Sequence, residues 1–195
     1  MIYFTSDLHF GHQNIIRYQD RPFSSVEEMD ERLIENYNSV VNNFDTVIFV
    51  GDVFFCNYPT AKDIMSRLNG TKILVRGNHD SEPSTMYKLG FDFVCENMRM
   101  KIGKTRVNVC HYPYLKKPWN HYFKYLIDKN YKYKANSYKR IPDDGLFLIH
   151  GHTHRTEQIQ GREINVCVEA WDYKPVPITN ISSLIDRSNN ENKKG

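Results

Sequence analysis

Five short apolar runs in this sequence end in side chains that could bind a metal ion. The run at residues 73–75 leads into Gly77-Asn78-His79-Asp80, where an amide, an imidazole and a carboxylate stand together. Polar side chains just past a strand end lie at the rim of a sheet, where α/β proteins usually build their sites. The other four runs end in the same way and lead into Asp7-Leu8-His9, Gly51-Asp52, His111 and Gly151-His152-Thr153-His154.

The residue types at these strand ends indicate a site for two metal ions. The candidate residues are Asp7, His9, Asp52, Asn78, His79, His111, His152 and His154. Carboxylates, imidazoles and an amide oxygen, without a thiolate, suit borderline to hard divalent ions: we expect Mn²⁺ first, with Fe²⁺, Zn²⁺, Ni²⁺ or Mg²⁺ as alternatives. Two ions about 3.5–4 Å apart, bridged by one carboxylate and a hydroxide, would use this set and clamp a phosphoryl group. Phosphoester hydrolysis is therefore the expected reaction class.

The elements between these strand ends predict an α/β domain with parallel strands. Ser24 and Ser25 precede acidic residues and an apolar pattern of helical spacing, so a helix should follow the first strand. A second helix is expected over residues 59–68, before the strand at residues 73–75. From residue 91 the pattern changes to short hairpin strands at residues 91–95, 98–102 and 106–110, with another at 164–168. A second sheet packed against the first is implied.

Length and composition favour one sizeable domain. The chain has 195 residues and a formal net charge of only +3, so a generally basic binding protein is not indicated. The four cysteines form no short-spaced pair, and no apolar stretch approaches the roughly 18 residues of a membrane span. We expect reduced thiols, no membrane partner, a cytoplasmic location, a domain over residues 1–186 and a flexible tail over residues 187–195.

The ordered set of five blocks resembles the signature of the calcineurin-like metallophosphoesterase superfamily. The blocks span residues 7–154. The opening Ser6-Asp7-Leu8-His9-Phe10-Gly11-His12 and the stretch from Asn165 to Pro175 are further similar to small stand-alone phosphoesterases of bacteria and their phages. The resemblance implies a four-layer α/β/β/α sandwich with two ions in a groove at the strand ends. By motif position, Asp7, His9 and His154 would hold one ion, Asn78, His111 and His152 the other, and Asp52 would bridge both. His79 would then act near the scissile bond, as a charge stabiliser or as the acid for the leaving oxygen.

One position departs from the pattern of the resembled family. Many relatives have an acidic residue three positions after the bridging aspartate, which orients the catalytic histidine, and Phe55 stands there in this chain. Asp80 is the nearest candidate to orient His79, so we expect both to be catalytic. The block also lacks the Asp-Arg-Gly of protein phosphatases, so phosphoprotein substrates are not expected.

The stretch at about residues 112–144 is rich in lysine and tyrosine and breaks the regular pattern. Long connections of this kind are usually lids or binding loops, and cations interleaved with aromatic rings suit a nucleotide or single-stranded nucleic acid. The alternative is a solvated face with packed tyrosines. Candidate substrate contacts are Lys116 and Lys117 in this stretch, with His12 and Asn14 after the first block.

Several functional alternatives stay open on the sequence alone. Nothing separates a phosphomonoester from a phosphodiester substrate. A nuclease of the same superfamily and a non-catalytic interaction module that keeps the fold are the competing functions. Loss of ligands would favour the interaction module, and none is lost here.

Overall fold

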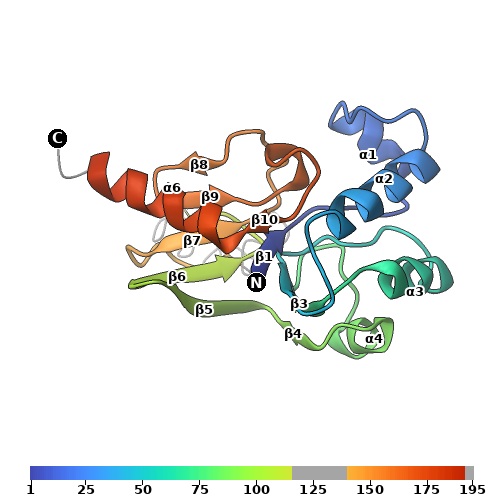
Figure 1. Ribbon diagram of the computed structural model, residues 1–195, viewed down its shortest axis with the longest axis horizontal. Coiled ribbons are helices and arrows are strands. Elements are labelled where there is room, and N and C mark those ends of the chain that lie inside the picture. Colours follow the sequence, from blue (N-terminus) through green and yellow to red (C-terminus); the bar gives the residue numbers. More distant parts are fainter. Residues whose placement is uncertain (116–139, 192–195) are drawn as a thin grey trace, which may run out of the picture.

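Two β-sheets of five strands each form the centre of the computed structural model, which describes residues 1–115 and 140–191 (Figure 1). The first sheet has the order β10-β1-β2-β3-β4, and the second has the order β5-β6-β7-β9-β8. The strands of the first sheet are β1 (Ile2–Thr5), β2 (Thr46–Phe49), β3 (Thr71–Val75), β4 (Phe93–Cys95) and β10 (Val176–Pro177). Those of the second are β5 (Asn97–Ile102), β6 (Thr105–Cys110), β7 (Phe147–His150), β8 (Ile159–Gln160) and β9 (Glu163–Asn165).

The strands that lead to the candidate site run parallel within each sheet. Strands β1 to β4 pair in parallel, and so do β6, β7 and β9, while the edge pairings of β10, β5 and β8 are antiparallel. The carboxyl ends of parallel strands meet at one edge of a sheet. The donor residues that follow these strands are thereby gathered at neighbouring edges of the two sheets.

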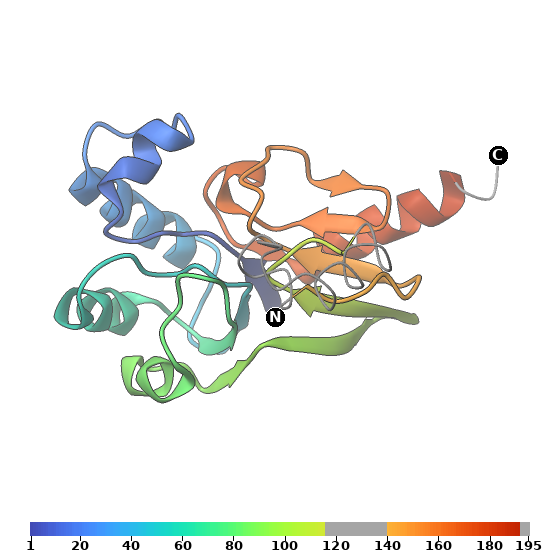
Figure 2. The ribbon, with the colours of Figure 1, turned by 180° about the vertical axis from the view of Figure 1, so that it is seen from behind.

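Four helices cover the outer face of the first sheet (Figure 2). They are α1 (Gln13–Tyr18), α2 (Val26–Asn38), α3 (Tyr58–Arg67) and α4 (Pro83–Leu89). Helix α2 begins at the predicted serine cap, where Ser25 Oγ accepts a hydrogen bond from Glu28 N–H at 3.2 Å. Met29 and Leu33 of α2 pack in one buried cluster with Val47 and Phe49 of β2, so burial of apolar side chains fixes the helices against the sheet.

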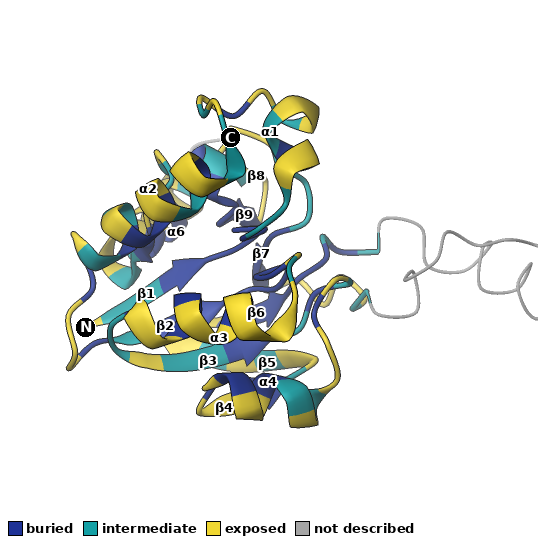
Figure 3. Ribbon diagram, turned by 90° about the vertical axis from the view of Figure 1, so that its right-hand side faces the viewer, coloured by how far each residue is buried: buried dark blue, intermediate teal, exposed yellow. Residues whose placement is uncertain are grey.

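A second apolar layer lies between the two sheets. Phe4 and Val50 from the first sheet's side meet Val109 and Ile149 of the second, and helix α6 (Ile178–Glu191) adds apolar side chains to the same cluster. Figure 3 shows central strands such as β7 and β9 buried and the helices exposed on their outward faces. None of the described helices is long and apolar enough to cross a membrane.

The predicted α/β class with two packed sheets is confirmed, with three differences in detail. The strand expected at residues 91–95 is β4, and it joins the first sheet in parallel with β3 rather than forming a hairpin in the second. Helices α1 and α4 were not predicted from the sequence. The expected tail begins inside α6, which is anchored by buried Ile181, Leu184 and Ile185 and continues over residues 187–191 to Glu191. Most of the expected lid, at residues 116–139, lies outside the described residues.

Candidate metal centre

The strand ends of both sheets bring the predicted donors into two clusters. Asp7, His9 and His154 form the first cluster, and Asp52, His111 and His152 form the second. Within each cluster, one potential ligand atom per residue lies within 4.8 Å of the others. The residues follow β1, β2, β6 and β7, so four strands from two sheets contribute donors.

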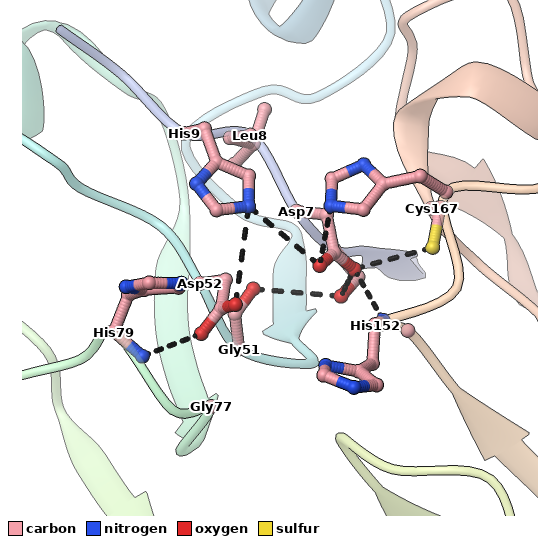
Figure 4. A network of polar contacts seen from close by, with 12 residues as sticks. Asp7, Leu8, His9, Gly51, Asp52, Gly77, His79, His152 and Cys167 are labelled. Carbon is pink, nitrogen blue, oxygen red and sulfur yellow. Dashed lines mark hydrogen bonds and ion pairs between the residues drawn. The ribbon is translucent and has the colours of Figure 1, made fainter. Parts of the chain in front are cut away.

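Asp52 lies between the two clusters. Its Oδ2 atom is 3.8 Å from His9 Nε2 and 3.4 Å from His111 Nε2. Its Oδ1 atom accepts a hydrogen bond from the backbone N–H of His79 at 2.8 Å, which fixes the carboxylate (Figure 4). Asn78 adds an amide oxygen to the second cluster, because its Oδ1 lies 3.2 Å from His111 Nε2.

Asp7 has one oxygen anchored and one facing the first cluster. Its Oδ2 atom accepts hydrogen bonds from His152 N–H at 2.8 Å, from the Ser6 hydroxyl and from the Cys167 thiol at 3.2 Å (Figure 4). Burial raises the pKa of Cys167 well above its usual value, so this sulfur acts as a thiol donor and not as a thiolate ligand. The Asp7 Oδ1 atom lies 3.9 Å from His9 Nε2 and 3.6 Å from His154 Nε2.

Unpartnered buried atoms show that the site fits metal ions. Asp7 Oδ1 and both ring nitrogens of His9 are buried without a hydrogen-bond partner. Buried polar groups of this kind are costly unless something pairs with them, and a divalent ion would do so. Burial also lowers the pKa values of His9 and His152 to about 4, so at neutral pH both imidazoles are uncharged and offer lone pairs.

Two further histidines have one ring nitrogen occupied by the protein. His111 Nδ1 lies 2.8 Å from Val50 O, and His154 Nδ1 lies 2.9 Å from Glu169 Oε1. A ring N–H donated to these oxygens leaves Nε2 as the lone-pair donor, which is how metal-ligating histidines are usually oriented. Burial would lower the pKa of His111, but the neighbouring Asp52 carboxylate outweighs it and raises the value to about 9. At the His111–Asp52 pair, a metal ion must therefore compete with the proton for the imidazole nitrogen.

Two residues that contact the first cluster, Glu169 and Arg21, were not predicted from the sequence. Glu169 lies in the short helix η2 (Val168–Ala170) and accepts a hydrogen bond from His154. It also accepts two hydrogen bonds from the buried guanidinium of Arg21, at 3.0 and 2.6 Å. Arg21 also donates to the backbone oxygens of Asp7 at 2.7 Å and Leu8 at 2.8 Å. Burial would raise the pKa of Glu169, but His154 and Arg21 lower it to about 2. Glu169 lies in the stretch at residues 165–175 that carries part of the resemblance, but no role was assigned to it, and its link to Arg21 spans 148 positions of the chain.

The backbone around the donors is held in an uncommon conformation. Five donors have positive φ, namely Asp7 (57°), His9 (51°), Asp52 (54°), His152 (68°) and His154 (51°). The left-handed region is unfavourable for residues other than glycine, and such strain clusters at functional sites. Gly77 and Gly151 permit the close approach, since a Cβ atom at either would collide with the carboxylate of Asp52 or of Asp7.

The Asp80 side chain is held by backbone groups. Its carboxylate accepts hydrogen bonds from the backbone N–H groups of Gly77 at 2.8 Å, Asp52 at 2.9 Å and Val53 at 3.0 Å. Both oxygens of the buried Asp80 carboxylate are thus engaged with backbone N–H groups, two of them in the loop that carries Asp52, so Asp80 fixes this loop.

His79 lies exposed at the edge of the site, against other rings. Its ring centroid is 5.5 Å from that of His9 and 5.2 Å from that of Phe55. The Phe55 ring in turn lies 4.0 Å from the ring of His12, whose Nδ1 accepts a hydrogen bond from Ile15 N–H and caps α1. Asn14 is exposed on α1, while Lys116 and Lys117 lie outside the described residues. Phe55 thus packs against His79 at the position where an acidic partner was anticipated.

This chain is similar to a known protein family, to proteins of an archaeon and a phage, and to a solved structure. The model of a family described as calcineurin-like phosphoesterase matches residues 1–174. An uncharacterized protein of Methanocaldococcus jannaschii is 34% identical, covering 95% of this chain and 92% of its own. The Gene 66 protein of Mycobacterium phage L5 is 31% identical over 87% of this chain and 86% of its own. A crystal structure of a protein of unknown function from Aquifex aeolicus is 28% identical, with a TM-score of 0.64, and the match covers 94% of this chain and 98% of that one.

Proposed function

Because this chain belongs to the calcineurin-like phosphoesterase family, we propose that it hydrolyses a phosphoester at a dinuclear metal centre. The supporting observation is the position of Asp52 Oδ2, within 4 Å of a ring nitrogen from each cluster. In this proposal Asp7, His9 and His154 hold one ion and Asn78, His111 and His152 the other, with Asp52 shared. Two bound divalent ions would supply Lewis acidity, activating water and neutralising phosphoryl charge, for which Mn²⁺ is our first candidate.

The protein's own groups have defined parts in the proposed reaction. Water oxygen attaches to phosphorus, the bond from phosphorus to the ester oxygen breaks, and that leaving oxygen needs a proton. The exposed His79 ring is the candidate donor, since its backbone N–H is tied to Asp52 Oδ1 and its ring lies beside His9. Proton transfer by a positioned histidine contributes about 10²–10⁴-fold to a rate. Glu169 and Arg21 act as positioning residues for His154 and for the Asp7 loop.

For the substrate we propose a nucleotide-like phosphoester, as the composition of residues 112–144 favours. A purely non-catalytic role would not need the complete donor set found at these strand ends. His12 and Asn14 stay candidate substrate contacts, because the His12 ring lies 5.6 Å from the His9 ring and Asn14 is exposed in the helix that His12 caps.

The function is tested by removing and restoring metal ions. The protein is treated with a chelator, desalted and assayed with p-nitrophenyl phosphate and bis-p-nitrophenyl phosphate, with and without added Mn²⁺. We expect no turnover in the stripped protein, full recovery with Mn²⁺ and two ions per chain by elemental analysis. Unchanged turnover in fully stripped protein would refute a metal-dependent mechanism. Preference between the two substrates separates a monoesterase from a diesterase.

A further inference from the structure

A cavity of about 280 Å³ lies between α3 and α4, with His79 on its wall. None of the six residues of the two clusters lines it. Its walls are mainly apolar and aromatic, formed by Phe54, Phe55, Tyr58, Ala61, Met86 and Leu89, and Ser81 and Thr85 add hydroxyl groups. An apolar hollow with a few polar groups is the usual form of a site for a small organic group.

The cavity presents aromatic surface that the described chain does not cover. Phe55 is 48% exposed and Tyr58 is 45% exposed, although both rings line a hollow. One side of Phe55 packs on His12, at 4.0 Å between ring centroids, which holds the ring in place. Held aromatic faces bind flat rings by stacking.

The walls of the cavity are fixed by hydrogen bonds between the two helices. Lys62 Nζ on α3 donates to Lys88 O at 2.7 Å and to Leu89 O at 3.1 Å on α4. The Tyr58 hydroxyl donates to Lys88 O at 3.3 Å. A preformed cavity of this kind binds without the cost of ordering its walls.

We propose that this cavity receives the leaving group of the substrate and that this group carries a flat aromatic ring. The inference deepens the proposed function and rests on it, because His79 would protonate the leaving oxygen and also lines the cavity. The group attached to that oxygen is therefore directed between α3 and α4.

Size and charge select the chemical class of the leaving group. An apolar cavity of about 150 Å³ holds a benzene molecule, so about 280 Å³ suits a substituted or fused ring such as a nucleobase. No lysine or arginine of the described residues lines the cavity, so a second phosphate has no cation there. A small aliphatic alcohol would leave the aromatic rim uncovered.

The test fills the cavity without touching either cluster. Thr85 is half-buried in the cavity wall on α4, so Thr85→Phe places a ring in the space. Thr60→Phe, on the exposed part of α3 outside the lining, controls for the added phenylalanine. Ser81→Phe fills the space from the loop that precedes α4 if Thr85→Phe folds poorly by circular dichroism.

Three measurements are compared across these variants. They are the Kd of adenosine for metal-free protein, kcat/KM for the nitrophenyl ester that the wild type hydrolyses, and the inhibition constant of inorganic phosphate. Thr85→Phe should weaken adenosine binding and lower kcat/KM, each by about 10-fold to 100-fold. Thr60→Phe should stay near wild type, and phosphate inhibition should not change in any of these variants, because phosphate reaches only the metal centre.

Three results would overturn the inference. Adenosine binding that is absent in the wild type, or unaffected by both Thr85→Phe and Ser81→Phe, would show that the cavity holds no ring. A parallel loss of phosphate inhibition would show that the variants damage the metal centre itself. If the wild type binds adenosine but hydrolyses no ester, the proposed function fails, and the leaving-group assignment fails with it, while ring binding stands.

Discussion

The two clusters of the candidate metal centre are supported by different means. In the first cluster, His154 is held by the Glu169 carboxylate and Asp7 by the Arg21 guanidinium at its backbone oxygen. In the second cluster, His111 is held by a backbone oxygen, that of Val50, and the Asp52 loop by the Asp80 carboxylate. A charged side-chain network therefore positions one cluster, and loops close in sequence to the motifs position the other. The first support should be sensitive to single side-chain changes and the second to changes in loop stability.

Asp52→Asn should weaken both clusters together, because Asp52 serves both. The amide weakens the donor at the atom nearest both His9 and His111, so we expect turnover to fall by more than about 10³-fold. Elemental analysis should show loss of metal from both clusters, whereas Asp63→Asn on the surface of α3 should retain two ions and full activity. Loss of only one ion with a less than tenfold fall would contradict a shared role.

His79→Ala should affect neither cluster and still lower turnover. Since His79 contributes its ring at the edge of the site and only its backbone N–H to Asp52, kcat should fall by about 10²–10⁴-fold with both ions kept. Steady-state kinetics with metal analysis of the same samples checks this. Loss of one ion in this variant would make His79 a ligand.

Glu169→Gln should weaken the first cluster selectively. The amide keeps the shape but loses the charge that holds His154 and Arg21, so we expect affinity for one ion to fall by about 10–100-fold. Excess Mn²⁺ should restore kcat, which a general loss of structure would not allow. Glu157→Gln at an exposed position is the matched control, and a deficit that excess metal does not restore would argue against a positioning role.

Asp80→Asn should have the smallest effect on chemistry and a clear effect on folding. One of three backbone N–H groups would face an amide N–H₂ in place of an acceptor, so the free energy of unfolding should fall by about 1–3 kcal/mol. Urea unfolding measures this loss. Asp92→Asn is the control, because Asp92 accepts one backbone bond, from Lys72 N–H, at an exposed site. An unchanged unfolding midpoint with lost activity would instead place Asp80 in the reaction.

The same comparison explains what could be predicted from the sequence. Donors that directly follow apolar runs were found, because strand ends and glycine turns are local signals and parallel strands gather them. Arg21 and Glu169 were missed, because arginine and glutamate are common surface residues and their pairing arises only when η2 packs beside the loop of residue 21. The backbone contacts of Asp80 were not predicted, since adjacency to His79 in sequence does not reveal that its carboxylate accepts three backbone hydrogen bonds. Strand β4 was placed in the wrong sheet because its three residues carry no signal for a partner strand.

The left-handed backbone at five donors limits which residues can replace them, independently of metal chemistry. Asparagine and glycine tolerate positive φ, whereas valine, isoleucine and threonine tolerate it poorly. A saturation library selected for folding alone, without any demand for activity, should therefore accept Gly or Asn at Asp7 and Asp52 and deplete β-branched residues there. The same library at His111, which is not among the positive-φ residues, should show no such bias. In the metal-free protein, the residues accepted at these donor positions would thus be set by the backbone conformation.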